Sequence, residues 1–147
     1  MRRFHFPLQK LLLLKSQEER AARRALATAV GEVATLDGEA RGLDASLRVC
    51  DQDEAAGGPA AALARALRAG LGARRTRVGR QLRDAELRLA SVRATFVERR
   101  KEHHALANLR ERRHEAWRME WNAAEQSELD ELARLRFAAR REQEQAR

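Results

Sequence analysis

Residues 22–50, ARRALATAVGEVATLDGEARGLDASLRVC, decide the fold of this chain. Apolar side chains recur there at alternating intervals of four and three residues: Ala22, Leu26, Ala29, Val33, Leu36, Ala40, Leu43, Leu47 and Cys50. A seam with a mean spacing of about 3.5 residues lies along one face of a helix and makes two helices wrap around each other. The stretch therefore predicts a helix that faces a partner helix along its whole length.

A second seam follows an interruption at residues 51–59, which ends in Gly57-Gly58-Pro59, a combination typical of a helix end and a turn. This seam holds Leu67, Leu71, Val78, Leu82, Ala85, Leu89, Val92 and Phe96, with Arg74 in one slot. We expect an all-α fold: a long antiparallel two-helix coiled-coil hairpin over residues 1–147, as a single domain. Helix 1 is predicted at about 8–49, the bend at about 51–60 and a longer helix 2 at about 61–140.

The strict register is lost on both sides of the seams. Extending the first seam backwards puts Lys15 and Glu19 in it, and the second lapses at Arg99 and His103. The second then resumes as Leu106, Leu109, Ala116, Trp117, Trp121, Ala124, Leu129 and Leu132. If both arms rise equally, Phe4 lies opposite roughly Arg112, so about 35 residues, or ~50 Å of helix, have no partner within the chain.

Composition fits long helices that bury a narrow seam, because only 4% of residues are aromatic, none is Tyr, and 35% are charged. The net charge of +8 falls entirely on residues 59–147 and mainly between Arg65 and Arg113. A basic stripe attracts nucleic acid, anionic membrane or an acidic protein surface. Since Phe96 is the only aromatic in the stripe, base stacking lacks its usual platform, and we do not expect nucleic acid as a partner.

The sequence indicates a binding protein and not an enzyme. It has no glycine-rich phosphate loop after a strand and no nucleophile beside a base, so no catalytic or cofactor-binding residue is predicted. The adjacent His103 and His104 point about 100° apart on a helix, which argues against a metal site. Cys50 is alone in the chain and no apolar run approaches the ~20 residues of a membrane span, so we expect a cytosolic protein.

Trp117 and Trp121 are four residues apart and share one helix face. Two interpretations remain open for them. They form an additional interface with a partner, or they pack in the seam, since large aromatics are enriched in both settings.

The two ends of the chain carry a more specific signal. The chain opens with FHFPLQKLLLLK at residues 4–15, and EQSELDELA stands at residues 125–133. These ends resemble the FliJ family of the bacterial flagellar type III export apparatus, whose members open with Phe-x-Phe-x-Leu-Gln-x-Leu-Leu. They close with Glu-Gln…Leu-Asp-Glu after a helical hairpin, and the middle of this chain matches only as coiled coil.

The resemblance implies a non-enzymatic, cytoplasmic component that is peripherally associated with the inner-membrane export apparatus through its partners. The family's coiled coil is similar to the central stalk of rotary ATP synthases, sits in the pore of the hexameric export ATPase, and promotes its assembly and activity. It links this ring to the cytoplasmic domain of the export gate, which would be contacted farther toward the bend, and export chaperones are further candidate partners. By resemblance, the ring is bound by Phe4, Phe6, Leu8, Gln9, Leu11, Leu12, Leu129, Asp130 and Glu131.

We further expect antiparallel geometry to bring Phe4, Phe6 and Leu8 beside residues 129–131 at one end of the hairpin. Three alternatives stay open. The chain is the equivalent stalk of a virulence type III secretion injectisome, a basic nucleic-acid-binding coiled coil whose affinity falls with salt, or a plain dimerising coiled coil.

Overall fold

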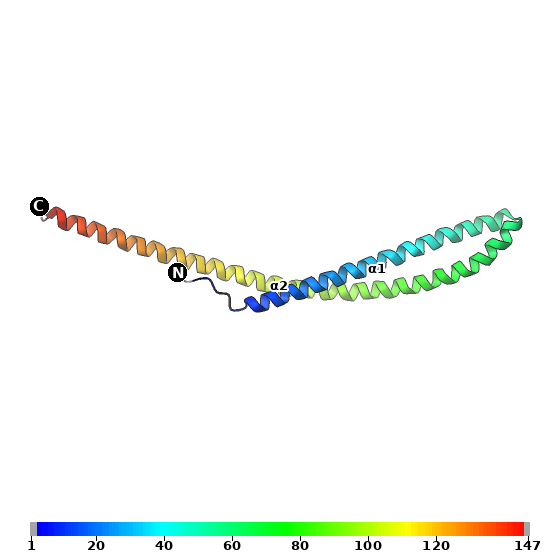
Figure 1. Cartoon of the computed structure of the whole chain (residues 1–147), viewed down its shortest axis with the longest axis horizontal. Coiled ribbons are helices and arrows are strands. Elements are labelled where there is room, and N and C mark those ends of the chain that lie inside the picture. Colours follow the sequence, from blue (N-terminus) through cyan, green and yellow to red (C-terminus); the bar gives the residue numbers. More distant parts are fainter. Residues whose placement is uncertain (1–2, 146–147) are drawn as a thin grey trace. The chain divides into compact units, whose positions relative to one another are not determined.

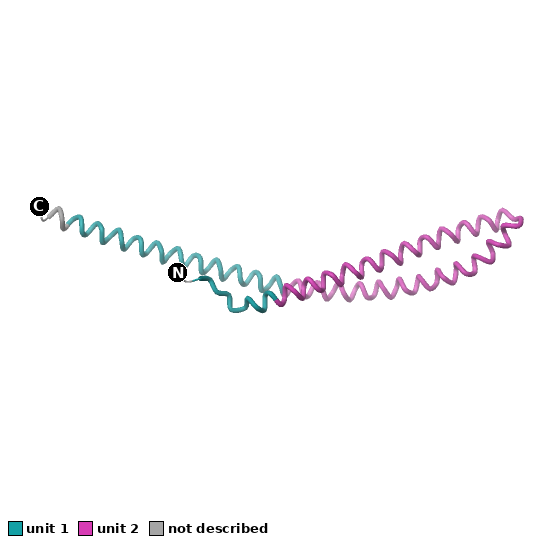
Figure 2. Tube along the Cα trace, in the orientation of Figure 1, with its two compact units in different colours: residues 1–13, 103–147 teal, residues 14–102 magenta. Residues whose placement is uncertain are grey.

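A computed structural model describes the backbone of residues 3–145 and the side chains of residues 3–141. It holds two helices, α1 (Gln9–Ala56) and the longer α2 (Pro59–Gln145), and the described residues contain no strand (Figure 1). This confirms the all-α hairpin with a longer second helix. Two compact units are distinguished, unit 1 (Met1–Leu13 with His103–Arg147) and unit 2 (Leu14–Glu102) (Figure 2). The single-domain organisation stays a prediction.

Unit 2 is the coiled-coil hairpin, in which α1 runs antiparallel to the first part of α2 (Figure 1). Every position predicted for the first seam is buried or half-buried, while most positions between them are exposed. The core is the cluster of Ala40, Leu43 and Val78, against which Leu36 and Leu71 pack. The alternating spacing in residues 22–50 therefore predicted the correct face of α1.

The second seam differs from the prediction near the bend. Leu67 is 52% exposed and Arg74 is exposed, so assigning these two residues to the seam was wrong. The buried or half-buried seam positions there are instead Ala61, Ala64, Leu71, Arg75 and Val78, and the slot between Ala64 and Leu71 falls on the exposed Arg68. Arginine is tolerated at position 75 because its aliphatic stem covers the seam while its guanidinium reaches Asp44.

The bend is tighter than predicted, because α1 continues to Ala56 and α2 already begins at Pro59. Gly57 and Gly58 make the turn with φ angles of 72° and 78°, a left-handed conformation that glycine adopts without steric cost. Proline suits the first helical position, where its missing N–H has no partner to lose. Residues 51–56 stay helical because Asp51 and Glu54 form ion pairs with arginines of α2.

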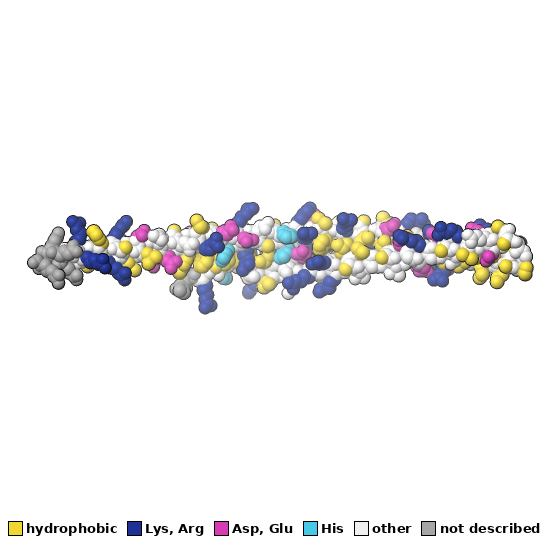
Figure 3. Space-filling model, turned by 90° about the horizontal axis from the view of Figure 1, so that it is seen from above, with side chains coloured by type: hydrophobic (Ala, Val, Ile, Leu, Met, Phe, Trp, Pro, Cys, Tyr) yellow, Lys and Arg dark blue, Asp and Glu magenta, His cyan; other side chains and the backbone are white. Residues whose placement is uncertain are grey.

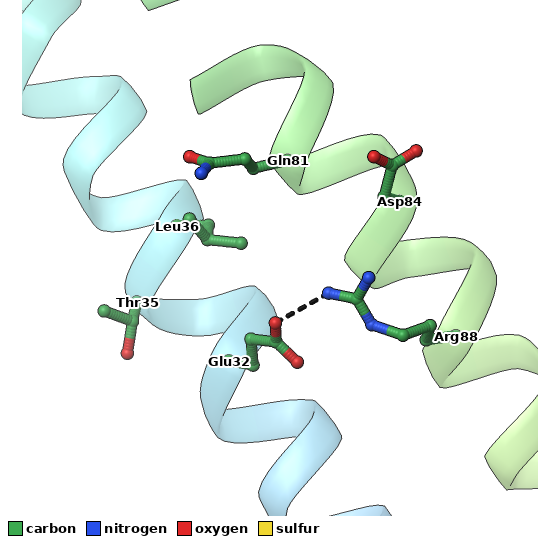
Figure 4. A pocket seen from close by; sticks show the side chains of 6 residues that line it. All are labelled: Glu32, Thr35, Leu36, Gln81, Asp84 and Arg88. Atoms are coloured by element: carbon green, nitrogen blue, oxygen red, sulfur yellow. Dashed lines mark hydrogen bonds and ion pairs between the residues drawn. The ribbon is translucent and has the colours of Figure 1, made fainter. Parts of the chain in front are cut away.

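Cross-helix ion pairs flank the seam along the hairpin. Acidic residues of α1 accept hydrogen bonds from arginines of α2, as in Glu39–Arg74 at 2.7 Å and Asp44–Arg75 at 2.6 Å. Glu32 and Arg88 form another pair, at 2.6 Å, beside Leu36, which points toward α2 (Figure 4). On the face shown in Figure 3, basic (dark blue) and acidic (magenta) side chains lie interspersed. Part of the Arg-rich stripe is therefore neutralised within the hairpin.

A charged layer stands where both apolar seams lapse. Lys15 lies 3.0 Å from Glu18 and 2.9 Å from Glu102, and Arg99 lies 3.2 Å from both carboxylates. Hydrogen bonds from Lys15 hold the pKa of Glu102 below its usual range, and the same contacts raise the pKa of Lys15. The layer replaces apolar contacts with paired charges at this end of unit 2.

Candidate partner-binding surface

The N-terminal segment of unit 1 packs against α2 before the first helix begins. The amide of Gln9 donates a hydrogen bond to the carbonyl of Phe6 at 3.1 Å, and Phe6 is only 4% exposed. The guanidinium of Arg113 lies over the Phe6 ring, 6.0 Å from its centroid, a cation–π geometry. Residues 4–6 are thus anchored on α2 by ring contacts and not by secondary structure.

Four aromatic rings follow one another at this place. The Phe4 ring meets His114 edge-on at 5.0 Å and lies 5.9 Å from Trp117, whose ring stacks on His114 at 5.8 Å. Trp121 stacks on Trp117 at 5.9 Å. Both tryptophans are half-buried, so each takes part in packing within unit 1 and keeps a surface for a partner. The role of His114 was not predicted, although its spacing of three residues from Trp117 could have suggested it.

The predicted clustering of the two family-matching ends is not formed. Phe4 contacts His114 and Trp117, whereas Leu129 follows Trp117 by twelve residues, about 18 Å along a helix. The clustering prediction was wrong because it was inconsistent with the predicted overhang of about 35 residues, which already places residues 129–131 beyond Phe4. The two candidate sets, residues 4–12 and residues 129–131, therefore form neighbouring patches of unit 1 and not one cluster.

The remaining candidates in the N-terminal set differ in exposure. Leu8, Gln9 and Leu12 are half-buried, and Leu11 is 39% exposed. Leu12 lines a shallow groove with residues of α2: His103, Ala107, Arg110, Glu111 and His114. In this set, therefore, some side chains pack within unit 1 and others are exposed to a partner.

The end of α2 has no cover from any described segment. Every described side chain from Asn122 to Arg141 is exposed, including those of Leu129, Leu132, Leu135 and Phe137. Leu132 follows Trp121 by eleven residues, about three turns, and Leu135 follows it by fourteen, about four turns, so all three share a face. We call residues 119–141 the free segment. The sequence analysis placed Leu129 and Leu132 there but missed Leu135.

A second apolar surface lies at the tip of unit 2. Val49, Leu63 and Leu67 are exposed there, and with Leu71 they line a groove that also includes the buried Cys50. Nothing in the sequence analysis predicted this groove. It arises because Ala61 and Ala64, and not Leu63 and Leu67, turn toward α1.

Two further findings concern the described part of the chain. No group of three or more His, Cys, Asp and Glu side chains there could hold a metal ion. No helix in that part is long and apolar enough to cross a membrane.

Comparison with known protein families identifies the family of this chain. The model of the family described as flagellar FliJ protein matches residues 4–142, which include both candidate ends and both helices of the hairpin. This chain belongs to the flagellar FliJ protein family. Membership confirms the resemblance inferred from the two ends, and it makes this chain a component of the flagellar type III export system, in a family whose members are non-enzymatic. No curated protein and no solved structure gives a significant match to it.

Proposed function

We propose that this FliJ-family chain is the stalk of the export ATPase. It stands in the pore of the hexameric ring, promotes assembly and ATP turnover of the ring, and couples the ring to the cytoplasmic domain of the export gate. It works in the cytoplasm, held peripherally at the inner membrane by these partners, and export chaperones are further candidate partners. The family match is to flagellar proteins, which favours this role over the injectisome alternative.

The uncovered end of α2 is the observation that carries the proposal. A helix that enters a pore must offer apolar and charged side chains around its surface without a competing intramolecular partner. Leu129, Asp130 and Glu131 are all exposed, so a leucine stands beside two carboxylates on the free segment. Apolar and basic pore loops would fit this surface, and the charges would determine orientation more than affinity.

The hairpin of unit 2 supports the coupling of the ring to the export gate. Its apolar seam and its cross-helix ion pairs brace α1 against α2 over most of unit 2. The tip groove around Val49, Leu63 and Leu67 offers apolar surface for a second partner. Because α2 is continuous from Pro59 to Gln145, the tip and the free segment belong to the same helix. We assign the gate contact to the tip groove.

The proposal is tested with the purified export ATPase, whose turnover and ring assembly are measured with and without this chain. The wild type is expected to raise both, and Leu129→Ala with Leu132→Ala is expected to abolish the increase. Leu87→Ala is the matched control, because Leu87 is also an exposed leucine of α2, at 71%, but lies outside the free segment. Circular dichroism should show equal helical content in all three proteins, since none of these leucines is buried.

The N-terminal set is tested by Phe4→Ala with Leu8→Ala, which should also abolish stimulation while the helices persist. Replacement of the bend by another flexible turn should leave stimulation intact. If wild-type protein leaves turnover and ring assembly unchanged and instead binds nucleic acid in low salt, the stalk function is wrong and the basic coiled-coil alternative is supported.

A further inference from the structure

The free segment carries its charges in two blocks of opposite sign. Residues 119–131 hold five acidic side chains and no basic one: Glu120, Glu125, Glu128, Asp130 and Glu131. Residues 132–141 hold four basic side chains and no acidic one: Arg134, Arg136, Arg140 and Arg141. The boundary between the blocks falls at Leu132, so the segment is a helix with an acidic first half and a basic second half.

An apolar stripe runs through both blocks. Trp121 stands in the acidic half, Leu132 at the boundary and Leu135 in the basic half, all on one face. The two leucines are 52% and 59% exposed, and no described segment of the chain covers them. A stripe of this kind on an isolated helix is unusual, because such helices gain most of their stability by burying an apolar face.

Among the described side chains of the free segment, one ion pair crosses this boundary, and it is weak. Arg134 lies 3.7 Å from Glu131, and both side chains are more than half exposed. An exposed pair of this type contributes little to stability. Asp130 accepts a hydrogen bond from Gln126 and the Arg141 guanidinium lies over the Phe137 ring, both within the segment. All charged side chains of the two blocks are nevertheless exposed, so they can face the charges of a partner.

We propose that a second copy of this chain covers the free segment, with the two helices antiparallel. In this arrangement the acidic block of each copy faces the basic block of the other, Leu132 meets Leu132, and Leu135 lies opposite Leu129 of the second copy. A two-fold axis near Leu132 makes the contact self-complementary, as closed dimers require. A parallel pairing would set acid against acid and base against base, so charge selects the antiparallel orientation.

The inference does not depend on the proposed function. If both are correct, the dimer occupies Leu129, Asp130 and Glu131, and self-association competes with binding to the ring. The experiment below measures self-association alone, so a failure of the ring proposal leaves its outcome unchanged.

Charge reversal tests the contact. Analytical ultracentrifugation of the full chain should show a monomer–dimer equilibrium at concentrations up to about 0.1 mM. An axis at Leu132 sets Arg136 against Glu128 and Arg134 against Asp130 of the second copy. Reversal of the two arginines, Arg134→Glu with Arg136→Glu, should weaken self-association by about tenfold or more, and so should reversal of the two acids that face them, Glu128→Arg with Asp130→Arg. All four changes in one chain restore complementarity, so this variant should dimerise as the wild type does.

Orientation is tested with spin labels in a Cys50→Ala background. Labels at Ala133, beside the proposed axis, should be close to each other in the dimer. Labels at Asn122 lie ten residues from Leu132, so they should be about 30 Å apart along the helix axis. In a parallel dimer both positions would give the same short distance.

All substituted side chains of the free segment are exposed, so their replacement should not unfold the helices. Equal circular dichroism spectra would establish that the helices persist and that a loss of association is not caused by unfolding. A monomer at every concentration, a dimer that ignores the block reversals, or equal distances at the two labelled positions would each overturn the proposal. Binding of the free segment to the ATPase by a strictly monomeric chain would assign the segment to the ring alone.

Discussion

Truncation of Leu43 to alanine should destabilise the hairpin strongly. Leu43 is 7% exposed and packs with Ala40 and Val78 at the centre of the apolar cluster. Leu43→Ala removes three carbon atoms from this site, at roughly 0.8 kcal/mol for each buried carbon, so the free energy of unfolding should fall by about 2 kcal/mol. A large additional cavity cost is not expected, because a core only two helices wide has solvent close by and can collapse around the site.

The assay is urea denaturation followed by far-ultraviolet circular dichroism. Leu87→Ala is the control, because it removes the same atoms from a leucine of α2 that is 71% exposed, and its effect should stay within about 0.5 kcal/mol. Equal losses for the two variants would refute the assignment of Leu43 to the core. A loss near zero for Leu43→Ala with an unchanged denaturant slope would do the same.

Three further predictions concern an ion pair, the turn and a glycine within α1. Hydrogen bonds from Arg75 lower the folded-state pKa of Asp44 below its ordinary 3.8, so its ionised form stabilises the fold above that pH, and this contribution is lost as the pH falls through the lower folded pKa. Thermal unfolding should therefore shift to lower temperature on acidification, and Asp44→Asn should make the shift smaller. Gly57→Val, at a φ of 72°, should cost about 1–2 kcal/mol. Gly31→Ala, where a new Cβ meets nothing within 4 Å, should instead stabilise the helix by up to about 1 kcal/mol in the same denaturation assay.

The coiled-coil hairpin was predictable because its cause is local and repetitive. The alternation from Ala22 to Cys50 identifies the buried face of α1, since a spacing near 3.5 residues is compatible with only one type of packing. The register of α2 near the bend was harder to predict from the sequence. Leu67 stands four residues before Leu71 and Arg68 three residues before it, so either one fits the alternating spacing. Hydrophobicity alone favours Leu67. In the structure neither side chain is buried: the seam passes through Ala64 and Leu71, and the exposed Arg68 between them reaches Asp51.

The candidate surface was predictable only in part. The two family-matching ends pointed to Phe4 and Leu129, but their separation depends on how far each arm extends past the other. The approximate position of the bend gave this offset to within a few residues, with Phe4 opposite roughly Arg112, and the contacts to His114 and Trp117 refine it. The contact of Phe4 with Trp117 follows from a turn at Gly57-Gly58, and it leaves Leu129 uncovered.

By itself the sequence determined the helical class, the face of α1 that is buried, the break at Gly57-Gly58-Pro59 and the family, because each depends on residue types at short fixed intervals. Only the tertiary structure decided which arginines of α2 neutralise the acids of α1, which rings hold the N-terminal segment, and which side chains next to the bend face α1. These features depend on contacts between residues far apart in the chain. Their geometry is determined by the joint packing of both helices, and no local pattern encodes it.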